Sequence, residues 1–288
     1  MLIFREIEPL MAYLRDKITQ DLSIGLVPTM GALHNGHLEL VKASKKANSI
    51  SVCSIFVNPT QFNNPSDLAK YPRTLEQDIT TLKSVGCDVL FCPDAEEMYH
   101  KPSTIKFDFD QLDKVLEGAF RPGHFSGVAL VVSKLFNIIK PTRAYFGQKD
   151  FQQFNIISRL VEDLNFTIEL VCFPTLRESD GLAMSSRNLR LSEEERKSAL
   201  VFYRALSFAK TELRKGIDLK SIKETIHTMC LQENHVRIEY FELADTENLN
   251  LLDNVKQANH AILLMAGFVG EIRLIDNMFI EDRERYEN

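Results

Sequence analysis

The chain has 288 residues, of which 44% are hydrophobic and 26% charged, and its formal net charge is -6. This composition is ordinary for a globular protein that buries its core without disulfide or metal staples. The acidic balance argues against a large nucleic-acid footprint, which normally shows as a basic face. The sequence contains no apolar run of about 18 residues and no basic segment leading into one. We therefore expect a cytoplasmic protein that binds neither nucleic acid nor a membrane.

The five cysteines point to the same compartment. Their number is odd, no C-x-x-C pair occurs, and several lie inside apolar, strand-like runs. Reduced thiols in the core of a cytosolic protein are therefore favoured over a disulfide framework.

The first half of the chain alternates predicted strands with predicted helices, as the spacing of its apolar residues indicates. The strands are 22–27, 50–57, 88–92, 143–146 and 167–172, and the helices are 74–85, 128–139, 151–164 and one that begins at Gly36. Continuous apolar strands in this alternation predict an α/β fold, a Rossmann-like parallel sheet with helices on both faces. Such sheets bind ligands at the carboxyl ends of their strands.

The pattern changes after about residue 176. Ser192 and Glu195 form an S-x-x-E capping box, which predicts the start of a long helix. A second helix is predicted at 219–233, and strands at 237–243, 261–268 and 270–277. The last two strands are separated by a short turn at Gly270, so they should form an antiparallel hairpin. We expect a Rossmann-like domain over 1–176 and a smaller α+β lid domain with a short antiparallel sheet over 177–288.

Two histidines lie at a glycine-containing turn that follows the predicted strand 22–27, where the next helix begins. His34 and His37 are three residues apart, so both can face one ligand. The N–H groups and the dipole of a helix N-terminus attract phosphate, which favours a nucleotide site. A buried structural pair and a zinc site are the alternatives, and the zinc site lacks a third ligand at recognisable spacing.

Polar side chains also follow two other strands. Asn58 and Gln61 are neutral donors and acceptors suited to a hydroxy acid, although turn formation alone would account for Asn58. Lys149 follows a strand and a glycine, where a compact cation suits phosphate. An isolated lysine is otherwise usually solvated.

Two loops and one helical carboxylate complete the candidates. The segment 116–127, rich in glycine and polar groups, fits a loop that closes over substrate, or an ordinary surface turn. The segment 174–188 has two hydroxyls and Arg187 beside a bend, which suits a mobile phosphate clamp at the domain junction. Asp78 lies on a predicted helix, where a solvated carboxylate is the default.

The stretch from Val27 to Leu38 resembles the HIGH-type motif of the nucleotidylyltransferase superfamily, and in its full length it resembles the pantothenate synthetase family. Further matches to that family are 54–62, 71–74, 116–127, 146–153, 174–188 and 273–277. They cover most of residues 24–190 in the order and spacing of the family, and the C-terminal part more thinly.

The resemblance implies an enzyme, an AMP-forming ligase of pantothenate and coenzyme A biosynthesis. It would activate pantoate with ATP as an acyl-adenylate, release pyrophosphate, and condense the adenylate with β-alanine to give pantothenate and AMP. The resemblance also implies Mg²⁺ and a homodimer. Domain 1–176 would bind nucleotide and pantoate.

The resemblance assigns roles to individual residues. The catalytic set is His34, His37, Lys149 and Arg187, with His37 as the proton donor and Ser186 joining the charge clamp. The contacts to ATP are Met30, Gly31, Ala32, Leu33, His34, Asn35, Gly36, His37, Gly147, Gln148, Lys149, Asp150, Leu176, Met184, Ser185, Ser186 and Arg187. Gln61 and Gln153, with Asn58, would bind pantoate, Gln61 would also bind β-alanine, and Asp78 would contact magnesium.

Other functions fit part of the pattern. They are another adenylyl- or cytidylyltransferase, an ATP-sensing regulatory module without chemistry, and a metallohydrolase built on His34 and His37. An aminoacyl-tRNA synthetase is disfavoured because the chain is short and acidic. The protonation of His37 stays open, because a helix N-terminus disfavours imidazolium whereas a bound triphosphate favours it.

Overall fold

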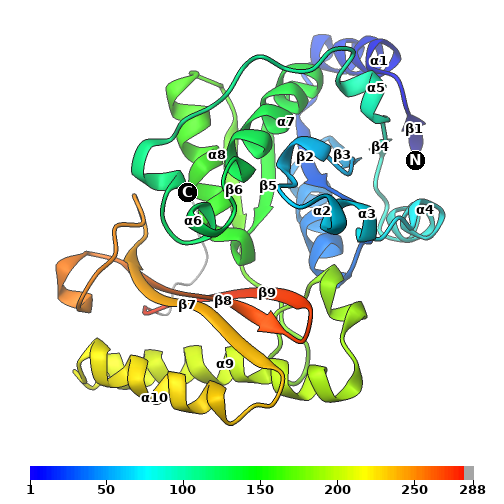
Figure 1. Cartoon of the computed structure of the whole chain (residues 1–288). Coiled ribbons are helices and arrows are strands. Elements are labelled where there is room, and N and C mark those ends of the chain that lie inside the picture. The colour runs from blue at the N-terminus through cyan, green and yellow to red at the C-terminus, as the bar shows by residue number, and fades with distance from the viewer. Residues whose placement is uncertain (282–288) are drawn as a thin grey trace. The chain divides into compact units, whose positions relative to one another are not determined.

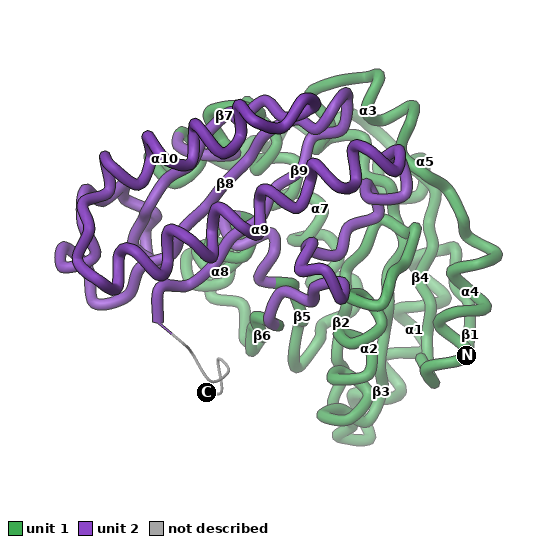
Figure 2. Tube along the Cα trace, turned by 90° about the horizontal axis from the view of Figure 1, so that it is seen from below, with its two compact units in different colours: residues 1–114, 118–147, 153–173 green, residues 115–117, 148–152, 174–288 purple. Residues whose placement is uncertain are grey.

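The computed structural model describes residues 1–281, which contain a six-stranded and a three-stranded sheet (Figure 1). The chain forms two compact units, coloured separately in Figure 2. The first comprises 1–114, 118–147 and 153–173, and the second comprises 115–117, 148–152 and the chain from 174 onward. The domain boundary expected after residue 176 stays a prediction.

The six-stranded sheet is parallel throughout. Its order is β1 (Leu2–Phe4), β4 (Val89–Phe91), β3 (Ile50–Ile55), β2 (Ile24–Thr29), β5 (Arg143–Gly147) and β6 (Glu169–Phe173). From β2 the chain builds outward to β3 and β4 on one side, and later to β5 and β6 on the other. The gap between the carboxyl ends of β2 and β5 is therefore the switch point at which such sheets bind ligands.

Helices cover both faces of this sheet, as predicted. The helices in this part of the chain are α1 (Ile7–Thr19), α2 (Asn35–Ala47), α3 (Pro65–Lys70), α4 (Leu75–Ser84), α5 (Ala95–Met98), α6 (Glu117–Phe120), α7 (His124–Ile139) and α8 (Phe151–Asp163), of which α3 and α6 contribute nothing to the cores on the sheet. Neighbouring side chains of a strand point to opposite faces. Leu26 accordingly joins a core with residues of α1, α7 and α8, whereas Val27 joins a separate core with residues of α2 and α4.

Three features of the first unit differ from the prediction. Strand β1 and helix α1 were missed, although Leu10 and Leu14 are spaced for one buried helix face. Strand β2 continues through Pro28, which was expected to end it. A proline is tolerated there because β5 pairs with β2 only at Gly25 and Leu26, so the missing N–H breaks no bond to β5. Helix α7 begins at His124, four residues earlier than expected.

The second unit confirms the predicted smaller α+β architecture. Helices α9 (Glu193–Arg214) and α10 (Leu219–Leu231) pack on the antiparallel sheet β7 (Val236–Asp245), β8 (Ala261–Val269) and β9 (Ile272–Phe279). The Ser192 capping box and the β8–β9 hairpin are both present. Across residues 1–281, no helix has the length and apolar character that crossing a bilayer requires.

Residues 115–117 belong to the second unit because a buried ion-pair network holds them there. Arg273 on β9 donates to both carboxylate oxygens of Glu117 at 2.7 Å and to Glu239 at 2.6 Å. Tyr240 donates to Glu117 at 3.0 Å. A buried pair is strongly destabilised when one partner is removed, so this segment and β9 form one structural body.

The contact between α2 and β2 has no room for a side chain at Gly25. A Cβ there would lie 2.2 Å from Ser44 Oγ and 2.4 Å from Asn48 Nδ2. We expect Gly25→Ala to lower stability by about 1–3 kcal/mol, the usual cost of overpacking. Gly147→Ala is the control, because a Cβ there meets nothing within 4 Å. Urea unfolding of both variants checks this, and equal midpoints would contradict the packing described here.

Candidate active site

The turn between β2 and α2 has a strained backbone. Gly31 and Ala32 have φ angles of 82° and 49°, in the left-handed region that a non-glycine residue rarely adopts. Asp78 on α4 holds this turn, since its carboxylate accepts the N–H of Ala32 at 3.0 Å and of Leu33 at 2.8 Å. Thr74 adds a hydroxyl donor at 3.2 Å. Hydrogen bonds to a charged acceptor are the strong ones, so one buried carboxylate fixes the turn.

The two histidines cap helix α2 reciprocally. His34 Nδ1 accepts the N–H of Gly36 at 3.1 Å, and His37 Nδ1 accepts the N–H of His34 at 3.4 Å. The ring centroids are 4.0 Å apart. Because each Nδ1 accepts, the proton of each neutral ring lies on Nε2. The helix N-terminus therefore presents two ring donors together with its own N–H groups, a combination suited to a polyphosphate.

Gln61 lies beside this turn. It ends the 3₁₀ helix η1 (Pro59–Gln61), which follows β3, and it is buried. Its Oε1 accepts from Asn58 Nδ2 at 3.1 Å, and its Nε2 contacts the sulfur of Met30 at 3.0 Å. The structure thus brings Met30 of the turn next to Gln61, 31 positions further along the chain, while Asn58 bonds to Gln61 from three positions away.

Asn58 is almost fully engaged within the protein. Its Nδ2 also donates to the carbonyl of Gly127 at 3.1 Å, and its Oδ1 accepts from the hydroxyls of Thr60 at 2.9 Å and Tyr99 at 2.8 Å. These bonds orient Asn58 and, through it, Gln61. A direct contact of Asn58 with pantoate stays a prediction. Tyr99 was missed because no local pattern links it to Asn58, 41 residues away.

The start of helix α7 supports η1. His124 Nδ1 donates to the carbonyl of Gln61 at 2.7 Å. A Cβ on Gly127 would lie 2.3 Å from the carbonyl oxygen of Thr60, so only glycine allows this approach. The sequence singled out the loop 116–127, and in the structure its end holds the strand-end turn that carries Gln61.

The second unit contains the remaining predicted ATP residues except Gly147, which belongs to the first. Leu176 and Met184 face each other across a bent loop, where the Met184 N–H donates to the Leu176 carbonyl at 2.9 Å. Ser185 then caps the 3₁₀ helix η4 (Ser186–Arg190) by accepting the N–H of Arg187 at 3.2 Å. The loop is therefore an ordered hairpin-like turn that ends in a capped helix.

Lys149 lies close to the same loop. Gly147 ends β5, and the next three residues form the 3₁₀ helix η3 (Gln148–Asp150). Lys149 and Ser185 line one cavity of about 10 Å³ with Asn188 and Asp276, roughly the room for one water. The structure thus joins two predicted phosphate-binding segments of the second unit. Gln153 is half-buried on α8, in the first unit.

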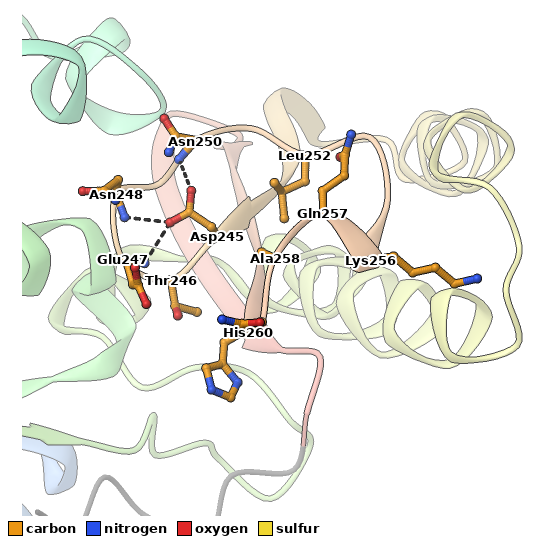
Figure 3. Close-up of a pocket in the computed structure, with 11 residues that line it drawn as sticks. Asp245, Thr246, Glu247, Asn248, Asn250, Leu252, Lys256, Gln257, Ala258 and His260 are labelled. Atoms are coloured by element: carbon orange, nitrogen blue, oxygen red, sulfur yellow. Dashed lines mark hydrogen bonds between the residues drawn. The ribbon is translucent and has the colours of Figure 1, made fainter.

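A larger hollow, of about 420 Å³, lies in the loop that follows β7 (Figure 3). Its lining comes from residues 245–260, which include none of the predicted site residues. Asp245 accepts the N–H groups of Glu247, Asn248 and Asn250, so its carboxylate stabilises the loop itself.

No three His, Cys, Asp or Glu side chains within residues 1–281 are grouped so that they could hold a metal ion. Asp78 already accepts three hydrogen bonds, two of them from the backbone of the turn. Its proposed contact with magnesium stays a prediction, whereas its part in shaping the turn is structural.

Fold and turn define the class of protein. A parallel sheet with a switch point beside β2, and a histidine-capped helix N-terminus directly after that strand, are typical of α/β proteins that bind a phosphate-bearing ligand.

Comparison with known proteins gives the family. The profile of the pantoate-beta-alanine ligase family matches residues 2–279. The pantothenate synthetase of Aquifex aeolicus is 47% identical over 282 residues, covering 97% of this chain and 99% of that protein. The one from Thermosipho africanus is 48% identical over 281 residues, covering 97% and 100%. The chain therefore belongs to the pantoate-β-alanine ligase family.

Solved structures agree with this assignment. The crystal structure of pantothenate synthetase from Thermus thermophilus superimposes with a TM-score of 0.91 at 40% identity, covering 97% of this chain and 99% of that one. The Francisella tularensis pantoate-beta-alanine ligase, complexed with beta-gamma ATP and beta-alanine, gives 0.83 at 36% identity, covering 98% and 99%. The predicted family, the fold class and a ligase that joins pantoate to β-alanine are confirmed.

The structural role of Asp78 can be separated from a metal-binding role. We expect Asp78→Asn to lose about 1–3 kcal/mol of stability, because an amide cannot accept all the donors that the carboxylate accepts. Glu76→Gln, an exposed carboxylate on the same helix, is the matched control and should change little. Unfolding is measured with a metal chelator present. A difference between the variants that arises only after Mg²⁺ is added would contradict the structural role.

Proposed function

We propose that this chain, an ATP-dependent pantoate-β-alanine ligase, works in two steps through a pantoyl-adenylate. A carboxylate oxygen of pantoate attacks the α-phosphorus of ATP, and pyrophosphate leaves. The amine of β-alanine then attacks the acyl carbon, loses a proton, and expels AMP. Activation is needed because a carboxylate is a poor acyl donor, whereas AMP is a good leaving group.

The reciprocal capping of α2 by His34 and His37 is the observation that carries this mechanism. Both rings are fixed through Nδ1 before any ligand arrives. Their Nε2–H groups can therefore meet the charge that develops on the phosphates without reorganisation, which is the main source of electrostatic catalysis. In this tautomer the rings donate while uncharged, as the helix dipole favours. His37 is also proposed as the proton donor, a role that requires its imidazolium form, which a bound triphosphate would favour.

Other groups are proposed to bind ATP around this pair. Backbone and side-chain groups from Met30 to Asn35, with Gly36, would contact the phosphates from the first unit. In the second unit, Lys149, Ser186 and Arg187 would supply positive charge and hydrogen-bond donors. Further contacts would come from Gln148, Asp150 and Ser185. Leu176 and Met184, whose backbones are paired, would hold the nucleotide. Gly147 leaves room beside its backbone, since a Cβ there meets nothing within 4 Å.

Pantoate is proposed to bind Gln61 and Gln153, with β-alanine also contacting Gln61. The Gln61 amide is buried and held by Asn58, so it can direct a neutral donor and acceptor at a hydroxy acid. Asn58 would act mainly by orienting it.

Three further properties are proposals. Mg²⁺ prefers waters and substrate phosphates to an all-protein cage, so it would arrive with ATP, with Asp78 as one candidate contact. The five cysteines are buried and form no disulfide bond with one another, which suits the reducing cytoplasm. The chain would work as a homodimer, which sedimentation of the purified protein tests.

The two-step mechanism is tested by supplying the substrates one at a time. With Mg-ATP and pantoate alone, the protein should release pyrophosphate, and AMP and pantothenate should follow only after β-alanine is added. If pyrophosphate appears only when pantoate and β-alanine are both present, the adenylate does not form before the amine binds, and the two-step order is contradicted.

Removal of the Nε2 donor of His37 should slow the first step. We expect His37→Asn to reduce pantoate-dependent pyrophosphate release by about 10²–10³-fold, as when other preorganised donors are lost. Asparagine keeps an acceptor for the cap, so the melting temperature should fall little. His227→Ala, an exposed histidine on α10, is the control. A His37→Asn rate within a few-fold of wild type would remove this residue from the mechanism.

A further inference from the structure

Asn277, on strand β9, is bound to the short helix that carries Lys149. Its Nδ2 donates to the carbonyls of Gln148 and Lys149, both at 2.9 Å. Its Oδ1 accepts from Gln148 Nε2 at 3.0 Å. The buried side-chain amide of Asn277 thus donates two hydrogen bonds to η3 and accepts one from it.

Helix η3 depends on such outside support. It has only three residues, and 3₁₀ hydrogen bonds are poorer than those of an α-helix. Lys149 lies in its middle with a side chain only 17% exposed, although lysine side chains normally stay in water and lose much rotamer freedom when held. The carbonyl of Lys149 is itself one of the two that Asn277 fixes, so the bond acts directly on the backbone from which the ammonium extends.

The residue before Asn277 holds the other predicted ATP segment. Asp276 is buried and accepts two hydrogen bonds from Arg177, at 2.6 and 2.9 Å. Arg177 also donates to the carbonyls of Gly181 and Asn277, at 3.1 and 3.2 Å. Burial raises the pKa of Asp276, while Arg177 and, more weakly, Lys149 act against that rise. Two consecutive residues of β9 therefore hold both η3 and Arg177, which in turn bonds to Gly181 within its own loop.

We propose that Asn277 is a positioning residue that holds Lys149 in place for the attack of the pantoate carboxylate on the α-phosphorus of ATP. This role rests on the two-step mechanism proposed above and deepens it. The segment 273–277 matched the family by resemblance alone, without a role, and the hydrogen bonds to η3 supply one. Because a cation displaced by about 1 Å can cost about 100-fold in rate, loss of Asn277 should act on kcat more than on the KM for ATP.

A double-mutant cycle tests this role. Asn277→Ala should slow pantoate-dependent pyrophosphate release by about 10–100-fold. In a chain that already carries Lys149→Ala, the same change should cost less than about twofold, because residues that act through one another are not additive. Asn277→Ser keeps one hydrogen-bond donor, so its rate of pyrophosphate release should lie between those of wild type and Asn277→Ala. It replaces the alanine variant in the cycle if that variant does not fold.

Met278→Ala is the matched control for general damage to β9. Met278 is half-buried, adjoins Asn277 and packs against the core of the second unit, so its loss should lower the melting temperature without slowing pyrophosphate release. Multiplicative losses in the double mutant, or an Asn277→Ala rate within twofold of wild type, would overturn the positioning role alone. A wild-type chain that releases no pantoate-dependent pyrophosphate would overturn the two-step mechanism together with it.

Discussion

The carboxylate of Asp78 is the constraint on which the phosphate-binding turn depends. The turn places Ala32 in the left-handed region, which costs a non-glycine residue roughly 1–2 kcal/mol. Two hydrogen bonds from its backbone to a buried charged acceptor offset that cost. With the backbone held there, His34 arrives at the N-cap of α2 and His37 one turn later. The histidine pair is thus set by a residue 41 positions beyond His37 in the chain.

The same principle recurs at each candidate site. Two of the groups proposed to touch substrate follow strand ends and are held by a buried asparagine, one near in the sequence and one distant. Asn58 orients Gln61, and Asn277 fixes η3 beneath Lys149. Such preorganisation suits a reaction whose protein contribution is positional and electrostatic, because little reorganisation is then needed as charge develops.

The sequence predicted the parallel sheet, its covering helices and the C-terminal hairpin, because continuous apolar strands and helical spacing are local patterns. It missed β1, whose three residues leave little pattern, and it ended β2 too early at Pro28 because pairing partners cannot be read from one strand. The residues of the site were named by motif resemblance. The supporting contacts of Tyr99 and Asn277 join residues 41 and at least 128 positions apart, so only the folded chain reveals these contacts.

The central claim is that a carboxylate oxygen of pantoate attacks the α-phosphorus of ATP. The most direct measurement is one turnover with pantoate labelled with ¹⁸O in its carboxylate, followed by mass spectrometry of the products. The two-step account predicts that one ¹⁸O per turnover appears in AMP, because the bond that forms to phosphorus is kept when the amine expels the nucleotide. Unlabelled AMP, or label found in inorganic phosphate, would contradict an adenylate and require activation at another phosphorus.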